Sequence, residues 1–301
     1  MSLQERLRPT IDRYWSGLPR NVRGIVWMLL SALAFVAVQT ATKFVGTRID
    51  SAEITFFRCF FGGLAILPFL IKNPVDAFRT TIPLMHVGRG VAGAAAIFCM
   101  VYSVVNMPLA EATAIGFARP LFMVVLAVLF LHEVVGWRRW TATAVGFGGV
   151  MIMLRPGIEV VSFAALAALL ASLFFSLAHV FIKKITKIDQ PMKVMAWYWA
   201  VSSIVTFVPM LFVWTTPNLE EFLLLMVVGF LSGTAQTLVV YSLRVGDASL
   251  VEPFDYSRII WALLAGVLIF GESTDIWVLL GATVVAASNI YIARRAAKRL
   301  E

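Results

Sequence analysis

The chain has 301 residues, of which 60% are hydrophobic and only 14% are charged, whereas about a quarter of the residues of a soluble domain are charged. Apolar runs long enough to cross a hydrocarbon core of roughly 30 Å as a helix recur along the whole chain, which excludes a soluble globular protein. The net charge of +8 does not indicate a nucleic-acid partner, because Lys and Arg gather at the ends of the apolar runs, where they orient membrane proteins.

In chain order, a polar segment over residues 1–23 precedes the first apolar run. We interpret that run as a retained membrane span rather than a cleavable leader. The later runs are separated by short connections marked by Pro and Gly, so we expect no second soluble domain. The sequence predicts an all-α integral membrane protein with transmembrane helices over 24–46, 52–71, 84–107, 109–131, 137–154, 162–184, 193–213, 222–244, 249–270 and 276–293.

The basic residues of the connections predict the orientation of these ten helices. They lie in the N-terminal segment, in every second loop and at the C-terminus, which puts nearly all of them on one side. The positive-inside rule then places both termini in the cytoplasm.

The two halves of the chain repeat each other, since residues 102–155 align on 241–294 without a gap and an upstream match lies in nearly the same register. The matched pairs are Arg119 with Arg258, Glu133 with Glu272, Gln39 with His179, and Lys43 with Lys183. Each half holds five helices, an odd number, so the second half starts on the opposite side and the repeat is inverted. Inverted repeats are typical of secondary transporters, which place the substrate between the halves.

Several motifs carry a resemblance to a known family. They are the stretch over residues 102–122, Leu131-His-Glu133, Gly136 to Trp140, Gly146 to Gly149, Leu154 to Gly157, Phe270-Gly-Glu272 and Gly281-Ala282. These motifs, with Arg58, resemble EamA-type transporters of the drug/metabolite transporter superfamily, in the branch of S-adenosylmethionine and riboflavin carriers. Arg119 departs from the family pattern, which more often has a small or hydroxyl residue at that position.

The resemblance implies a domain organisation and a location. It predicts a cytoplasmic segment over 1–23, five-helix repeats over 24–156 and 157–295, and a cytoplasmic tail over 296–301. It also implies a multi-pass protein of the bacterial inner membrane that transports metabolites. The substrates of the family include amino acids, S-adenosylmethionine, riboflavin, nucleotide-like compounds and organic acids.

Charged residues deep inside a span are costly, so they face a cavity or a partner. Arg119 and Arg258 lie about ten residues into their helices, which is roughly 15 Å and near the membrane midplane. Two guanidinium groups there suit a carboxylate or a phosphate. Alternatively each Arg pairs with a structural acid, and Asp255 lies three residues from Arg258 on one helix face.

Other polar and aromatic residues inside the spans complete the predicted substrate-binding set. They are Arg58, Gln39, His179, Gln236, Tyr102, Phe117, Tyr256 and Trp261. Arg58 could instead bind carbonyl groups at a helix end, and the uncharged polar residues could join helices by hydrogen bonds. His86 and Arg89, near the start of their helix, are expected to reach back to the cytoplasmic face.

The carboxylates inside or beside the spans fall into two groups. Glu111, Glu252 and Asp255 are candidates for coupling, because burial raises a carboxyl pKa towards neutrality. Glu111 could equally be a plain helix cap. We interpret Glu133 and Glu272, each at the end of one helix, as structural carboxylates at the positive end of the following helix.

The sequence therefore predicts a secondary transporter that moves a small anionic or zwitterionic organic metabolite by alternating access. An exporter or importer of amino acids, S-adenosylmethionine or riboflavin is one alternative, and a channel or sensory membrane protein is another. We expect no enzyme, cofactor or metal site, because the chain has no P-loop and its histidines lack ligand spacing. The expected partners are the bilayer and a small molecule, without nucleic acid. Coupling to protons or a counter-substrate, and monomer against homodimer, stay open.

Overall fold

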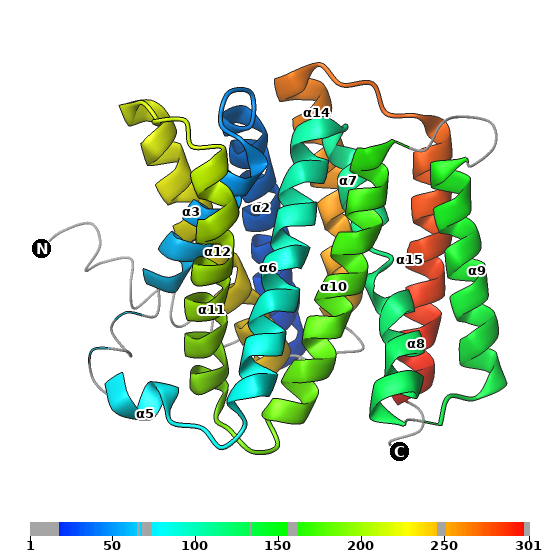
Figure 1. The fold of residues 1–301 in the computed structure, drawn as a ribbon. Coiled ribbons are helices and arrows are strands. Elements are labelled where there is room, and N and C mark those ends of the chain that lie inside the picture. Colours follow the sequence, from blue (N-terminus) through cyan, green and yellow to red (C-terminus); the bar gives the residue numbers. More distant parts are fainter. Residues whose placement is uncertain are drawn as a thin grey trace, which may run out of the picture.

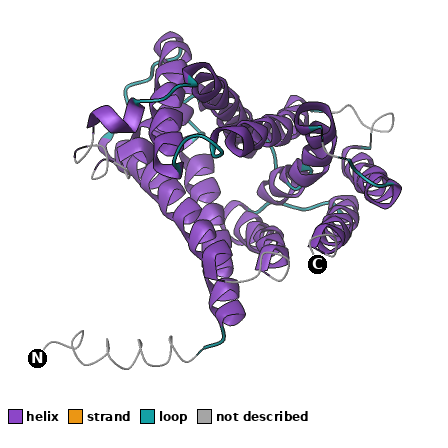
Figure 2. Ribbon diagram, turned by 90° about the horizontal axis from the view of Figure 1, so that it is seen from below, coloured by secondary structure: helices purple, strands orange, loops and turns teal. Residues whose placement is uncertain are grey.

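The described residues form a bundle of helices. A computed structural model describes residues 18–64, 67, 71, 74–132, 134–155, 162–245 and 251–297. Within these ranges the chain forms helices and loops without a strand, and most helices run along the same direction (Figures 1 and 2). Six described segments are long and apolar enough to cross a membrane, one of them being residues 109–131 taken as a whole. The prediction of an all-helical membrane protein is confirmed at this level.

The helices agree with the predicted segments to within a few residues at most ends. They are α2 (Arg20–Val45), α3 (Ser51–Leu64), α5 (Pro74–Phe78), α6 (Pro83–Asn106), α7 (Leu109–Gly116), α8 (Arg119–Leu131), α9 (Trp137–Leu154), α10 (Phe163–Ile185), α11 (Pro191–Phe212), α12 (Leu219–Val245), the 3₁₀ helix η1 (Glu252–Tyr256), α14 (Ser257–Phe270) and α15 (Ile276–Ala297). The short helix α5 was not predicted. Most of the predicted segment after Leu64, up to residue 71, lies outside the described residues.

Two segments predicted as continuous helices are broken. The segment over 109–131 divides into α7 and α8, with Phe117 and Ala118 between them. Pro120 explains this break, because it has no N–H group and its ring clashes with the carbonyl of Gly116, four residues earlier. The segment over 249–270 likewise consists of η1, which contains a proline near its start, followed by α14.

The carbonyl groups freed by the first break find partners on other helices. The bonds are from the Ser172 hydroxyl to the Gly116 carbonyl at 3.2 Å, from the Ser176 hydroxyl to the Arg119 carbonyl at 2.8 Å, and from the Asn289 amide to the Phe117 carbonyl at 2.9 Å. Because an unsatisfied carbonyl in an apolar medium costs several kcal/mol, α10 and α15 make the break tolerable.

Both broken segments end in the same backbone conformation. His132, after α8, has φ 53°, and Gly271, after α14, has φ 63°. The two residues occupy matching positions of the repeat. Glycine adopts this left-handed conformation without strain, whereas a side chain there costs roughly 1–2 kcal/mol.

The helices pack in a recurring pattern. α2 packs on α12 and α6 on α10, while α3 packs on α11, α7 on α14 and α9 on α15. Each of these pairs joins a helix of the first half to one of the second. In the repeat α2 matches α10 and α12 matches α6, so exchanging the two halves turns the pair α2–α12 into α10–α6. Each of the other three pairs joins a predicted helical segment of one half to the matching segment of the other.

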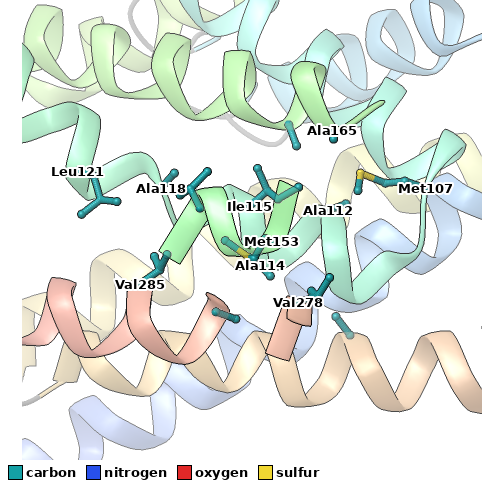
Figure 3. Close-up of a cluster of buried hydrophobic side chains, with 14 of the residues drawn as sticks. Met107, Ala112, Ala114, Ile115, Ala118, Leu121, Met153, Ala165, Val278 and Val285 are labelled. Atoms are coloured by element: carbon teal, nitrogen blue, oxygen red, sulfur yellow. The ribbon is translucent and has the colours of Figure 1, made fainter. Parts of the chain in front are cut away.

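The pair α9–α15 is held by direct backbone contact. A Cβ on Gly149 would lie 2.8 Å from the Gly281 carbonyl oxygen, and one on Gly281 would lie 2.5 Å from the Gly149 oxygen. About two turns away along both helices, the Ser288 hydroxyl donates a hydrogen bond to the carbonyl of Ala142. This crossing borders a core made by α7 to α10, α14 and α15, in which Ala112, Ala114 and Ile115 lie among side chains of the neighbouring helices (Figure 3).

Candidate functional site

The two helix breaks face each other. The rings of Phe117 and Tyr256, one from each break, have centroids 4.6 Å apart. These residues match in the repeat, as do Arg119 and Arg258, which lie two residues further along. The charges of the two arginines are near enough to interact. The ring contact brings the two breaks together, and the role predicted for the arginines beside them stays a prediction.

Each of these arginines lies over an aromatic ring. The guanidinium carbon of Arg119 is 4.3 Å from the centroid of Phe175 on α10, and that of Arg258 is 4.0 Å from Phe35 on α2. A ring face attracts the cation but takes no N–H bond in the guanidinium plane. The Nε atoms of both arginines are buried and have no hydrogen-bond partner among the described residues.

Asp255 pairs with Arg258, as the structural alternative proposed. Their side chains approach to 2.7 Å, and they are 26% and 16% exposed. No ion pair with a described residue is formed by Arg119. Among the described side chains, one carboxylate thus forms an ion pair with one of the two guanidinium groups at the breaks.

Arg89 contradicts the expectation that it reaches back to the cytoplasmic face. Its side chain is only 6% exposed, and its guanidinium carbon lies 4.1 Å from the ring centroid of Tyr198 on α11. Gly93, one turn further along α6, makes room for this ring, because a Cβ there would lie 2.4 Å from it. Neither Nε nor Nη1 of Arg89 has a hydrogen-bond partner within the described ranges.

Tyr198 also connects the remaining arginines. The charges of Arg58, on α3, and of Arg119 both act on its hydroxyl group. Arg58 is half-buried, and its Nε atom is buried without a hydrogen-bond partner among the described residues. No carbonyl bond of the kind proposed as an alternative is seen for Arg58 in that part of the chain. Arg58, Arg89, Arg119 and Arg258 are called the arginine cluster below.

His86, also near the start of α6, is covered by the loop between α10 and α11. It is fully buried, stacks on Trp197 at 5.4 Å, and its Nε2 donates to Asp189 in the α10–α11 loop at 2.9 Å. Burial opposes ionisation of Asp189, but the hydrogen bonds from His86 and Thr80 outweigh it and hold the pKa of that carboxyl below its usual value. This contact ties α6 to the second half of the chain.

Two further predicted binding residues, His179 and Gln39, differ in their position relative to the cluster. His179 is exposed, donates from Nδ1 to the Phe175 carbonyl at 2.7 Å, and has Arg119 and Arg89 as electrostatic neighbours. Gln39 is buried and accepts a hydrogen bond from Thr113 at 3.2 Å, so it joins α2 to α7.

The remaining predicted residues are not brought to the arginine cluster by any contact within the described ranges. Tyr102 packs against the core of the bundle, and Gln236 and Trp261 are exposed on α12 and α14. Among the coupling candidates, Glu111 is half-buried in the first turn of α7 and has an interaction partner. The side chain of Glu252 lies outside the described residues, as does Glu133.

Glu272 is structural, but it serves a different helix from the one expected. Its carboxylate accepts a 2.8 Å hydrogen bond from the Leu109 N–H at the start of α7 and forms an ion pair with Lys43. Lys43 also donates to the Met107 carbonyl at 2.7 Å. The start of α15 is served instead by Asp275, which accepts from the Trp277 N–H. We call Lys43, Glu272 and the start of α7 the lysine clasp.

The described residues contain no group of three His, Cys, Asp or Glu side chains that could hold a metal ion. Both cysteines are free, with Cys59 buried and Cys99 half-buried. The guanidinium groups of Arg119 and Arg258 give the breaks the means to recognise negative charge.

The chain is similar to known transport proteins. Residues 22–155 and 162–294 each match the EamA-like transporter family. The chain is 32% identical to an S-adenosylmethionine uptake transporter of Rickettsia bellii, covering 89% of this chain and 92% of the relative. It is 30% identical to a riboflavin transporter of Rhizobium johnstonii (93% and 94% covered) and 26% identical to a pseudopaline exporter of Pseudomonas aeruginosa (90% and 96%). A solved crystal structure shares the fold, with a TM-score of 0.59 at 16% identity, over 89% of this chain and 97% of its own.

Proposed function

The chain belongs to the EamA-like transporter family and is a multi-pass membrane transporter, and from this premise we propose that it is a secondary carrier. In this proposal it moves a small anionic or zwitterionic organic metabolite across the bacterial inner membrane by alternating access. The observation that carries the proposal is the meeting of Arg119 and Arg258 at two helix breaks.

The packing supports a carrier of ten membrane spans in two inverted halves, over 24–156 and 157–295. The family matches twice along the chain, and helix pairs exchange with each other when the halves are exchanged. α2 begins and α15 ends on the same side of the bundle (Figure 1), which agrees with both termini in the cytoplasm. Two such halves can swap conformations and expose one central site to each side in turn.

The helix breaks support a substrate site at the centre of this arrangement. Secondary transporters place discontinuous helices at the midplane, with the positive ends of the half-helices directed at anionic groups of the substrate. Arg119 is the first residue of α8 and Arg258 the second of α14, so each guanidinium adds to the positive end of its own half-helix.

The named relatives support a small organic substrate but do not identify which one. Among them are proteins for S-adenosylmethionine, riboflavin and pseudopaline, and both uptake and export are represented. Glu111 and Asp255 remain proposed as coupling residues, with a proton or a counter-substrate as the coupled species.

The test uses the purified full-length protein in proteoliposomes, with labelled amino acids, dicarboxylates, S-adenosylmethionine and riboflavin. A carrier gives saturable uptake and counterflow of its substrate, whereas a channel gives linear flux. We expect Arg119→Ala and Arg258→Ala each to lower uptake at least about tenfold, the factor that about 1.4 kcal/mol of lost binding gives. Arg138→Ala, an exposed arginine beside Trp137, is the matched control. Unchanged uptake in both cluster variants would refute the proposed site.

A further inference from the structure

Four guanidinium groups share one neighbourhood in this protein, and among the described residues one of them has an acidic side chain as an ion-pair partner. Arg58, Arg89 and Arg119 all interact with Tyr198, and Arg119 also interacts with Arg258. Within the described ranges, Asp255 is the carboxylate that pairs with one of the four, Arg258. Four positive charges against one negative charge leave three that the described protein does not neutralise.

Aromatic rings cover one face of the guanidinium group in three of the four arginines. Tyr198, Phe175 and Phe35 lie over the guanidinium groups of Arg89, Arg119 and Arg258 at 4.0–4.3 Å. The N–H groups at the guanidinium edge remain available, and the Nε atoms of all four arginines are buried without a hydrogen-bond partner in the described part. Arg89, 94% buried, also has an unpartnered Nη1. A carboxylate or phosphate binds such an edge through two parallel hydrogen bonds.

The arginines of the cluster come from different parts of the fold. Arg119 and Arg258 lie at the helix breaks, while Arg58 and Arg89 come from α3 and α6. Tyr198 lies over the guanidinium group of Arg89 and has Arg58 and Arg119 as electrostatic neighbours. A single carboxylate can accept from one or two guanidinium groups, so one anionic group does not serve all four arginines.

We propose that the transported molecule is an organic dianion, with one acidic group at Arg119 and Arg258 and the other at Arg58 and Arg89 beside the Tyr198 hydroxyl. This inference rests on the proposed function and narrows it. An isolated charge inside a membrane protein costs several kcal/mol, so a site with three uncompensated cations favours a ligand that brings more than one negative charge. S-adenosylmethionine, which carries a sulfonium cation, and riboflavin, which has no acid group, fit this site poorly.

Binding to the detergent-purified full-length protein tests the inference independently of transport. Thermal-shift titrations compare succinate and 2-oxoglutarate with monomethyl succinate, glutamine, S-adenosylmethionine and riboflavin. We expect the dianions to stabilise the protein and monomethyl succinate to bind at least about tenfold more weakly. Preference for any of the other probes over both dianions, or the absence of any shift with a dianion, would overturn the proposal.

Variants of Arg89 separate ligand binding from packing. Arg89→Met keeps the apolar stem and the contact with Tyr198 but removes the charge, and we expect it to weaken dianion binding at least about tenfold while circular dichroism stays unchanged. Arg89→Lys should restore part of the affinity, and Arg138→Met should bind as the unmodified protein does. If Arg89→Met binds the dianion with unchanged affinity, the inference is wrong. Linear flux of a dianion that binds well would instead refute the proposed carrier and leave this inference standing.

Discussion

The lysine clasp gives a stability prediction whose size follows from its contacts. Lys43 and Glu272 are only 16% and 11% exposed, so each charge depends on the other rather than on water. Losing one partner of a buried pair costs about 3–5 kcal/mol. A hydrogen bond to a charged group, such as that from the Leu109 N–H at 2.8 Å, contributes about 1.5–3 kcal/mol.

Glu272→Gln keeps an acceptor for Leu109 but leaves Lys43 without a counter-charge, so we expect a loss of about 3 kcal/mol. Lys43→Met leaves the Glu272 carboxylate with the start of α7 as its partner. We expect this variant to lose about 2–3 kcal/mol of the free energy of unfolding, because the positive end of the α7 dipole still stabilises the carboxylate. In the double variant neither charge is stranded, so its loss should fall short of the sum by about 2 kcal/mol or more.

The assay is reversible unfolding in mixed detergent micelles, followed by far-UV circular dichroism, for the unmodified protein, both single variants and the double variant. Arg48→Gln and Glu221→Gln form the matched control, since that ion pair also joins the two halves but lies at an exposed end where we expect little change. Losses that add within about 0.5 kcal/mol would show that the two charges act independently and that the reasoning fails.

Three further predictions concern the backbone and pH. His132→Gly should raise the free energy of unfolding by about 1 kcal/mol in the same unfolding assay, because His132 is in a left-handed conformation; a lower stability would contradict this. Gly281→Val should lower it by at least about 1–3 kcal/mol, because no side chain fits against the Gly149 carbonyl, whereas Gly148→Ala, with open space at its Cβ, serves as the control. Asp189 has a folded pKa below its usual value, so its stabilisation is fully present above about pH 4 and is lost as pH falls through the folded pKa. Asp189→Asn should therefore reduce the fall of the melting temperature at acidic pH. An unchanged fall would count against the role of the hydrogen bonds that His86 and Thr80 donate to Asp189.

Hydropathy and the internal repeat predicted much of this fold, because both depend on local composition. The predicted helix over 137–154 has the observed ends, and the repeat matches Phe117 with Tyr256, whose rings are in contact. The helix breaks were missed although Pro120 is visible, because proline in a membrane span is tolerated when neighbouring side chains bind the freed carbonyls. Those donors, such as Ser172 and Asn289, are identified only by tertiary packing.

Arg89 was missed for a related reason. A long side chain near a helix start can extend to the membrane surface or turn inwards, and position along the helix does not distinguish the two. The choice depends on Tyr198 of another helix and on the space left by Gly93. Likewise, no sequence pattern links Glu272 to a helix that begins at Leu109, since the two are far apart in the chain.

The electrostatic interaction between Arg58 and Tyr198 has a consequence for how a carrier of two halves binds a polar substrate. In the register that matches Lys43 with Lys183, Arg58 and Tyr198 occupy the same place in their halves. In a dimer of identical halves, a residue on the twofold axis would face its own copy, so an arginine would repel an arginine. A single fused chain removes that constraint, because one copy can keep the charge while the other becomes a phenol that attracts it. Covalent fusion thus permits a polarised binding site with distinct ends, which symmetry would forbid.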